Sequence, residues 1–64
     1  MRINRKKLAV LLIEKDMKVL QLVEKSGVSR CTVSAVRSGK SCSPETARRL
    51  AEALGVDVTE ILED

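Results

Sequence analysis

The sequence predicts an all-α fold, a compact bundle of five short helices, and three observations support this prediction. Apolar residues recur at the three- and four-residue spacing of amphipathic helices. Small polar residues able to cap helix N-termini precede most of these segments, and a glycine follows three of them. No segment alternates apolar and polar residues as a β-strand does. At 64 residues the chain is expected to form a single domain, residues 1–64.

The first two helices are expected over residues 5–15 and 18–26, with residues 16–17 as the connection. Asn4 can cap the first helix. The apolar stripe of that helix contains Leu8, Leu11 and Leu12, and Ala9, Val10 and Ile13 are expected to widen it. The second helix is expected to end at Gly27, because glycine readily adopts the positive φ angle that closes many helices.

The third and fourth helices are expected over residues 30–37 and 44–54. Ser29 can cap the third helix, whereas Ser43 and Pro44 give the fourth an N-cap and a first-turn proline. Their apolar stripes contain Val33, Val36, Ala47, Leu50, Ala51 and Leu54.

A short fifth helix is expected over residues 57–62. Asp57 and Glu60 have the spacing of a capping box, in which side chains bond to the backbone N–H groups at a helix start. Three apolar residues lie on one side of this segment: Val58, Ile61 and Leu62. They are candidates for the core, for a weak dimer contact, or for both.

Composition argues against several classes of protein. Without Phe, Trp or Tyr, the chain lacks the aromatic platforms on which single-stranded nucleic acids stack. It has no His, and Cys31 and Cys42 cannot make a tetrahedral metal site by themselves, so we expect no enzyme, metal site or cofactor. Two cysteines are too few for a disulfide framework, and the apolar run of residues 8–13 is too short for a secretory signal or a membrane span. A reducing, cytoplasmic location is therefore expected.

Charge is distributed unevenly along the chain, whose formal net charge is +3. Residues 1–42 contain ten bases against three acids, a net charge of +7, and residues 43–64 contain two bases against six acids, a net charge of −4. This asymmetry is expected of a molecule that offers one face to a polyanion. A solvated charged surface would explain it equally well, so charge alone leaves both interpretations open.

The second and third expected helices, joined by a short turn around Gly27, predict a helix-turn-helix. Two short helices joined in this way must cross steeply to share their small apolar surface. The second of them then projects from the domain and can enter the DNA major groove, which is about 12 Å wide. Its face opposite Val33 and Val36 is small and polar. Arg30, in its first turn, is the side chain able to contact guanine O6 and N7 together.

Five stretches of the chain carry a family resemblance: residues 22–34, 38–40, 44–47, 50–56 and 57–62. In this order and spacing they resemble the lambda repressor and Cro-like (XRE) helix-turn-helix family, over nearly the whole chain. The resemblance implies a five-helix domain that binds double-stranded DNA and regulates transcription. It also implies a repressor that acts as a homodimer on a palindromic operator.

The resemblance assigns roles to individual positions. The base-reading positions of the family, in its third helix, fall on Arg30, Cys31, Thr32, Ser34 and Ala35. Phosphate contacts are expected around this helix and at the starts of the first two helices, from Arg5, Lys6, Lys18, Ser29, Arg37, Ser38 and Lys40. The expected partners are double-stranded DNA and a second copy of the chain, with no membrane or small-molecule ligand.

The chain departs from the family's pattern at two places. Many members begin the second helix with Ser or Thr followed by Gln, where this chain has Lys18 and Val19. Lys18 can still contact a phosphate, but the glutamine contact is lost. Some members pair an arginine of the first helix with a glutamate late in the third, where this chain has Leu12 and Arg37. Leu12 is then expected to pack, leaving Arg37 for phosphate or for a nearby acid such as Glu14.

Two alternatives stay open. One is an antitoxin-like protein-interaction module with autoregulatory DNA binding; a long toxin-wrapping extension would favour it, and the sequence shows none. The other concerns Cys31, which is either a thiol switch on the groove-facing surface or a small residue tolerated there. Cys42 has no assigned role.

Overall fold

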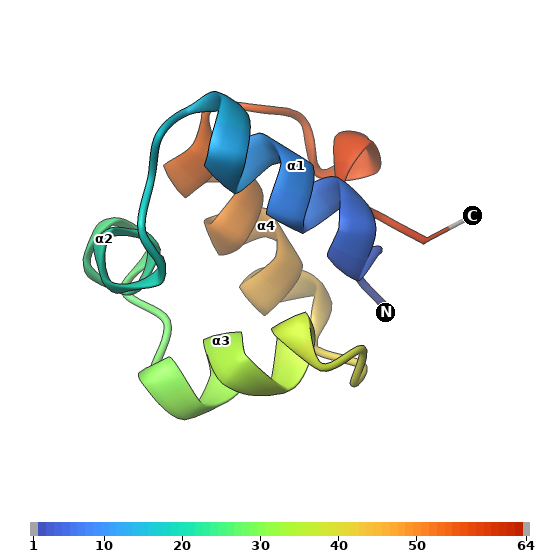
Figure 1. Ribbon diagram of the computed structural model, residues 1–64. Helices are drawn as coiled ribbons and strands as arrows, with labels where there is room; N and C mark the ends of the chain where they lie inside the picture. Colours follow the sequence, from blue (N-terminus) through green and yellow to red (C-terminus); the bar gives the residue numbers. More distant parts are fainter. Residues whose placement is uncertain (1, 64) are drawn as a thin grey trace.

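The computed structural model describes residues 2–63, which form four α-helices and one short turn of 3-10 helix (Figure 1). The helices are α1 (Arg5–Glu14), α2 (Val19–Ser26), α3 (Arg30–Arg37) and α4 (Pro44–Leu54), and the 3-10 turn is η1 (Val58–Glu60). The prediction of an all-α fold is confirmed, but the prediction of five helices is wrong. Within residues 2–63, no helix combines the length and the apolar character needed to cross a membrane.

Helices begin where the sequence supplies a polar cap next to apolar residues. The Asn4 side-chain oxygen accepts hydrogen bonds from two backbone N–H groups in the first turn of α1, at 3.0 and 3.2 Å. Ser29 and Ser43 cap α3 and α4 in the same way. Ile3 and Leu8 are both buried and occupy the two positions of a hydrophobic staple around the Asn4 cap. The caps therefore fix where these helices start and how the chain enters them.

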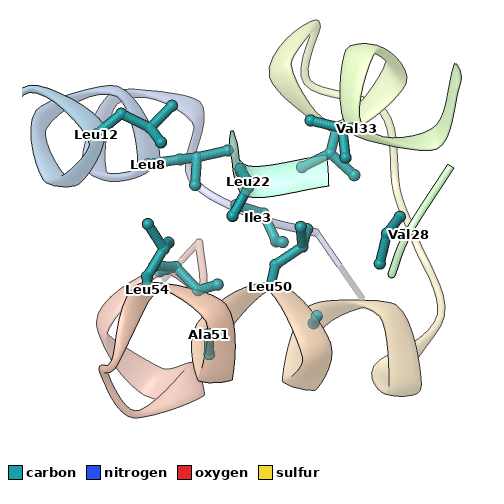
Figure 2. Close-up of a cluster of buried hydrophobic side chains, with 12 residues drawn as sticks. Ile3, Leu8, Leu12, Leu22, Val28, Val33, Leu50, Ala51 and Leu54 are labelled. Atoms are coloured by element: carbon teal, nitrogen blue, oxygen red, sulfur yellow. The ribbon is translucent and has the colours of Figure 1, made fainter. Parts of the chain in front are cut away.

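A single hydrophobic core lies between the helices (Figure 2). Helix α2 packs against α4, and α3 packs against both α1 and α2. The buried side chains are Ile3, Leu8, Leu12, Leu22, Val28, Val33, Val36, Ala47, Leu50, Ala51, Leu54 and Ile61. Fully burying a large aliphatic side chain contributes roughly 1.5–3 kcal/mol, so this cluster is the main stabilising element of so small a domain. No polar or charged residue is buried in the described part of the chain.

The segment expected as a fifth helix makes only the single turn η1. The Asp57 carboxylate accepts a hydrogen bond from the Thr59 backbone N–H at 3.1 Å, so the expected capping residue does cap the turn. Ile61 and Leu62 do not continue a helix after this turn.

Pairing between the two ends of the chain explains why this helix stops. The Asn4 backbone N–H donates to the Ile61 carbonyl at 2.7 Å, and the Glu63 backbone N–H donates to the Arg2 carbonyl at 3.0 Å. Ile3 also forms an isolated antiparallel bridge with Leu62. These bonds engage backbone groups that an α-helix would satisfy within itself. We call residues 2–4 and 61–63 together the terminal clasp.

Helices α2 and α3 cross steeply, as predicted for a helix-turn-helix. Figure 1 shows α2 almost end-on, whereas α3 lies across the view. Gly27 ends α2 with a φ of 71°, and its N–H donates to the Val23 carbonyl at 3.1 Å. Val28 then turns into the core, with 8 % of its surface exposed, and Ser29 starts α3. The left-handed glycine thus sets the direction in which α3 leaves the domain.

Candidate DNA-binding surface

Helix α3 has one face in the core and one in solvent. Val33 and Val36 are 0 % and 1 % exposed, and both belong to the buried cluster. Arg30, Cys31 and Ser34 are exposed. The structure therefore brings these three predicted base-contacting residues together on the outer face of the helix, with no large apolar side chain among them.

The other two predicted base-contacting residues are half-buried, Thr32 and Ala35. The Thr32 backbone N–H donates to the Ser29 hydroxyl oxygen at 3.2 Å, and the two hydroxyl oxygens are 2.8 Å apart. Both hydroxyl groups are therefore engaged in starting α3. A contact from Ser29 to phosphate or from Thr32 to a base has to coexist with this cap.

The C-terminal end of α3 is closed by local hydrogen bonds. The Ser38 hydroxyl donates to the Ser34 carbonyl at 2.9 Å, and the Lys40 backbone N–H donates to the Ala35 carbonyl at 3.1 Å. The side chains of Ser38 and Lys40 are exposed here. Arg5 approaches the same end, because a Cβ built on Gly39 would lie 3.9 Å from the Arg5 Cδ. The Arg5 side chain at the start of α1 thus lies against the loop that carries Lys40.

Lys18 and Arg37 line one shallow cleft, where the start of α2 meets α1 and the end of α3. Its floor is apolar and includes Leu12 and Val19. Leu12 is buried, as expected from its departure from the family's pattern. Asp16, rather than Glu14, is the acid that lines this cleft beside Arg37. Two predicted phosphate contacts from different helices therefore lie on one surface.

Sequence reasoning missed how α2 is anchored. The Lys18 backbone N–H donates to the Gln21 side-chain oxygen at 2.8 Å, which supplies half of a capping box at the start of α2. The sequence did indicate this bond, since a glutamine three residues after the N-cap is one of the usual residues to accept the hydrogen bond of the N-cap N–H in a capping box. Asp16 was also missed as a lining residue; it adopts a positive φ of 50° in the connection after α1.

Within the described residues, the predicted phosphate-contacting cations of this surface form no ion pair. Within residues 2–63 the ion pairs formed are Arg2 with Glu63 at 3.9 Å and Arg49 with Glu45 at 2.9 Å. Glu45 and Arg49 line a shallow cleft together with Ser29 and Thr32 at the start of α3. The predicted phosphate-contacting cations are all exposed and take part in neither pair: Arg5, Lys6, Lys18, Arg30, Arg37 and Lys40. Positive charge around α3 is therefore available to an outside anion.

The candidate dimer residues divide between core and surface. Ile61 is 0 % exposed and belongs to the core, whereas Val58 and Leu62 are half-buried. Any contact with a second copy at this segment would therefore fall on Val58 and Leu62.

The two cysteines differ in environment. Cys31 is exposed on α3, and Cys42 is half-buried in the loop before α4. Burial raises the pKa of the Cys42 thiol above its ordinary value, because removal from water disfavours the thiolate.

A steeply crossed helix pair whose second helix carries an exposed, polar and cationic face defines the helix-turn-helix class of DNA-binding domain. The chain belongs to the Cro/C1-type HTH DNA-binding domain family, whose model matches residues 7–64. This match confirms the resemblance found in the sequence. No curated protein sequence matches the chain.

Among solved structures, the chain is similar to part of a longer enzyme. It is 26 % identical to native PhpD with cadmium atoms, with a TM-score of 0.85, and to PhpD with cadmium complexed with hydroethylphosphonate, with a TM-score of 0.86. A mutant of hydroxyethylphosphonate dioxygenase gives 26 % identity and a TM-score of 0.87. Each match covers 100 % of this chain but 14 % of the other. The similarity therefore concerns a small helical unit within that enzyme.

Proposed function

We propose that the chain is a sequence-specific regulator of transcription that places α3 in the major groove of double-stranded DNA. The observation that carries this proposal is the set of exposed cations around α3 that form no ion pair in the described part of the chain. The family match supports DNA binding by this surface. Arg30 is assigned to a base, and Arg5, Lys18 and Lys40 are assigned to phosphates on either side of the groove.

We further propose that the active form is a repressor homodimer on a palindromic operator. One short helix contacts only a few base pairs, so two half-sites about one helical turn apart are needed for specificity. The asymmetric distribution of charge supports a single DNA-facing side per copy. The proposal is for a binding protein rather than an enzyme, in a cytoplasmic location.

Selection of binding sites from random duplex DNA at two salt concentrations tests this function. We expect enriched sequences with two-fold symmetry. If the dimer neutralises about six phosphates, log affinity should fall with log salt at a slope of about −5. Selection that enriches no sequence would contradict specific recognition, and an affinity insensitive to salt would contradict the assigned phosphate contacts.

A further inference from the structure

A second shallow cleft, largely polar, lies where the start of α3 meets α4. Its volume is about 250 Å³, and Ser29 and Thr32 of the α3 cap line it together with Thr46 of α4. The charged side chains that line it are Glu45 and Arg49, both from α4. We call this the α3–α4 cleft.

The α3–α4 cleft and the cleft that contains Lys18 lie on different flanks of α3. Thr32 lines the first cleft and Arg37 lines the second, and five residues along an α-helix correspond to about 140° around its axis. Cys31 and Ser34 are exposed between these two flanks. A helix in the major groove has a phosphate backbone on each side. In the proposed complex, each flank of α3 therefore faces phosphates.

The Arg49 guanidinium is paired with a carboxylate in the free chain. Its Nη2 donates to the Glu45 Oε1 at 2.9 Å, and the two side chains are 50 % and 63 % exposed. An exposed ion pair between residues four apart in a helix favours its closed form by only about a factor of two. A DNA phosphate carries a full negative charge, so it can replace this carboxylate at little cost.

We propose that Arg49 is a further phosphate-contacting residue and that Glu45 competes with DNA for it. On binding, the Arg49 guanidinium exchanges the Glu45 carboxylate for a phosphate of the backbone on this flank of α3. Glu45 lowers the affinity for DNA of any base sequence, because it must be displaced and because its charge repels the backbone. This contact rests on the proposed function, since it exists only when α3 lies on duplex DNA.

Fluorescence anisotropy with a duplex that carries one selected half-site, at several salt concentrations, tests the Arg49 contact. We expect Arg49→Ala to weaken binding about threefold or more at low salt and to reduce the slope of log affinity against log salt by about 1. Arg49→Lys keeps the charge and should retain most of the affinity. Arg48→Ala is the matched control, because it removes the same charge from the next position of α4, where Arg48 lines a different cleft. It should leave the slope nearly unchanged.

A double-mutant cycle tests the competition by Glu45. Glu45→Gln should raise the affinity for the half-site about twofold or more, because it frees Arg49 and removes a negative charge. In the Arg49→Ala background the same change should give a smaller gain, since no guanidinium is left to free. Glu52→Gln is the matched control, because Glu52 is an exposed carboxylate of α4 outside the α3–α4 cleft. Circular dichroism checks that each variant is folded.

Two results would overturn the Arg49 contact: equal affinity and salt slope in Arg49→Ala and the parent, or an equal loss in Arg48→Ala. An unchanged affinity in Glu45→Gln, or an equal gain in both backgrounds, would overturn the competition. In all these cases the parent still binds its selected half-site and Arg30→Ala still weakens that binding. A parent that binds no selected duplex would instead contradict the proposed function.

Discussion

In the proposed complex with DNA, recognition of the base sequence is assigned chiefly to Arg30. Its guanidinium is exposed in the first turn of α3 and takes part in no ion pair within the described residues. Its neighbours on the outer face, Cys31 and Ser34, are too short to reach two acceptors of one base. Arginine can donate two hydrogen bonds to guanine O6 and N7, which gives it both reach and geometry.

We predict that Arg30→Ala reduces affinity for the selected operator by about 1–3 kcal/mol and relaxes the preference at one base position. Arg48→Ala is the matched control, because Arg48 is an exposed arginine of α4 assigned no role in DNA binding. Fluorescence anisotropy on the operator and its single-base variants measures both effects. Equal binding by Arg30→Ala and the parent on every duplex would remove Arg30 from the reading role.

The two thiols should differ in reactivity. Burial raises the pKa of Cys42, so at a given pH a smaller fraction is thiolate, the reactive form, and alkylation of Cys42 should demand a higher pH. Cys31 is exposed, so we predict that iodoacetamide near pH 8 modifies it first. Peptide mass spectrometry measures the order of modification. Faster modification of Cys42 would contradict the burial that the structure shows.

At the scale of the element, the left-handed glycine between α2 and α3 fixes the direction of α3. Gly27 has a φ of 71°, and nothing lies within 4 Å of the position that a Cβ would take. A side chain there meets no steric obstacle, so its cost comes from the backbone alone.

We predict that Gly27→Ala lowers the free energy of unfolding by about 1–2 kcal/mol, the cost of holding a residue with a side chain in this conformation. Glu52→Ala, at an exposed position of α4, is the control and should change stability by less than about 0.5 kcal/mol. Urea denaturation measures both values. Unchanged stability in Gly27→Ala would show that the turn relaxes away from the left-handed conformation.

The four α-helices could be predicted from sequence because their caps and stripes are local. Asn4, Ser29 and Ser43 cap their helices as expected, and Gly27 and Gly55 close theirs in the left-handed conformation. The prediction of a fifth helix was wrong for a non-local reason. Its local capping signal is satisfied within one turn of 3-10 helix, whereas its backbone continues in pairing with residues at the other end of the chain.

At the scale of the whole molecule, the terminal clasp joins the two ends of the domain. Ile3 is 1 % exposed and lies among the core side chains (Figure 2). The backbone groups of its neighbours Arg2 and Asn4 form hydrogen bonds with the backbone of the C-terminal segment. The sequence indicates a buried role for Ile3, because an apolar residue just before an N-cap often packs against the first turn of the helix. Leu62, with which Ile3 pairs, lies almost 60 residues away along the chain. Local pattern alone could not identify that partner.

We predict that Ile3→Ala lowers the free energy of unfolding by about 2–4 kcal/mol, through lost burial and the cavity left behind. A domain of this size has a total stability of roughly 3–10 kcal/mol, so the loss is a large fraction. Leu20→Ala, with its parent side chain 55 % exposed, is the control and should cost less than about 1 kcal/mol. Equal effects of the two changes would contradict the clasp as part of the core.

The exposure of most residues in the candidate DNA-binding surface could be predicted from the sequence, but their arrangement in space could not. The helix periodicity placed Cys31, Ser34, Ala35 and Ser38 on the outer face of the third helix, with Arg30 and Thr32 on its flanks. In the structure Ala35 and Thr32 are half-buried, and the other four residues are exposed. The cleft shared by Lys18 and Arg37, and the presence of Asp16 in it, depend on how α1, α2 and α3 meet. The periodicity of apolar residues within one helix does not show how three helices are placed relative to one another.

The most direct test of the account is a titration of the isotope-labelled chain with a selected operator duplex, followed by backbone amide shifts in NMR spectra. We predict that the largest shifts fall on α3 at Arg30, Cys31 and Ser34 and at Lys18, with little change around Arg48. Unmoved signals along α3, or changes confined to α4, would contradict the central claim that α3 enters the major groove.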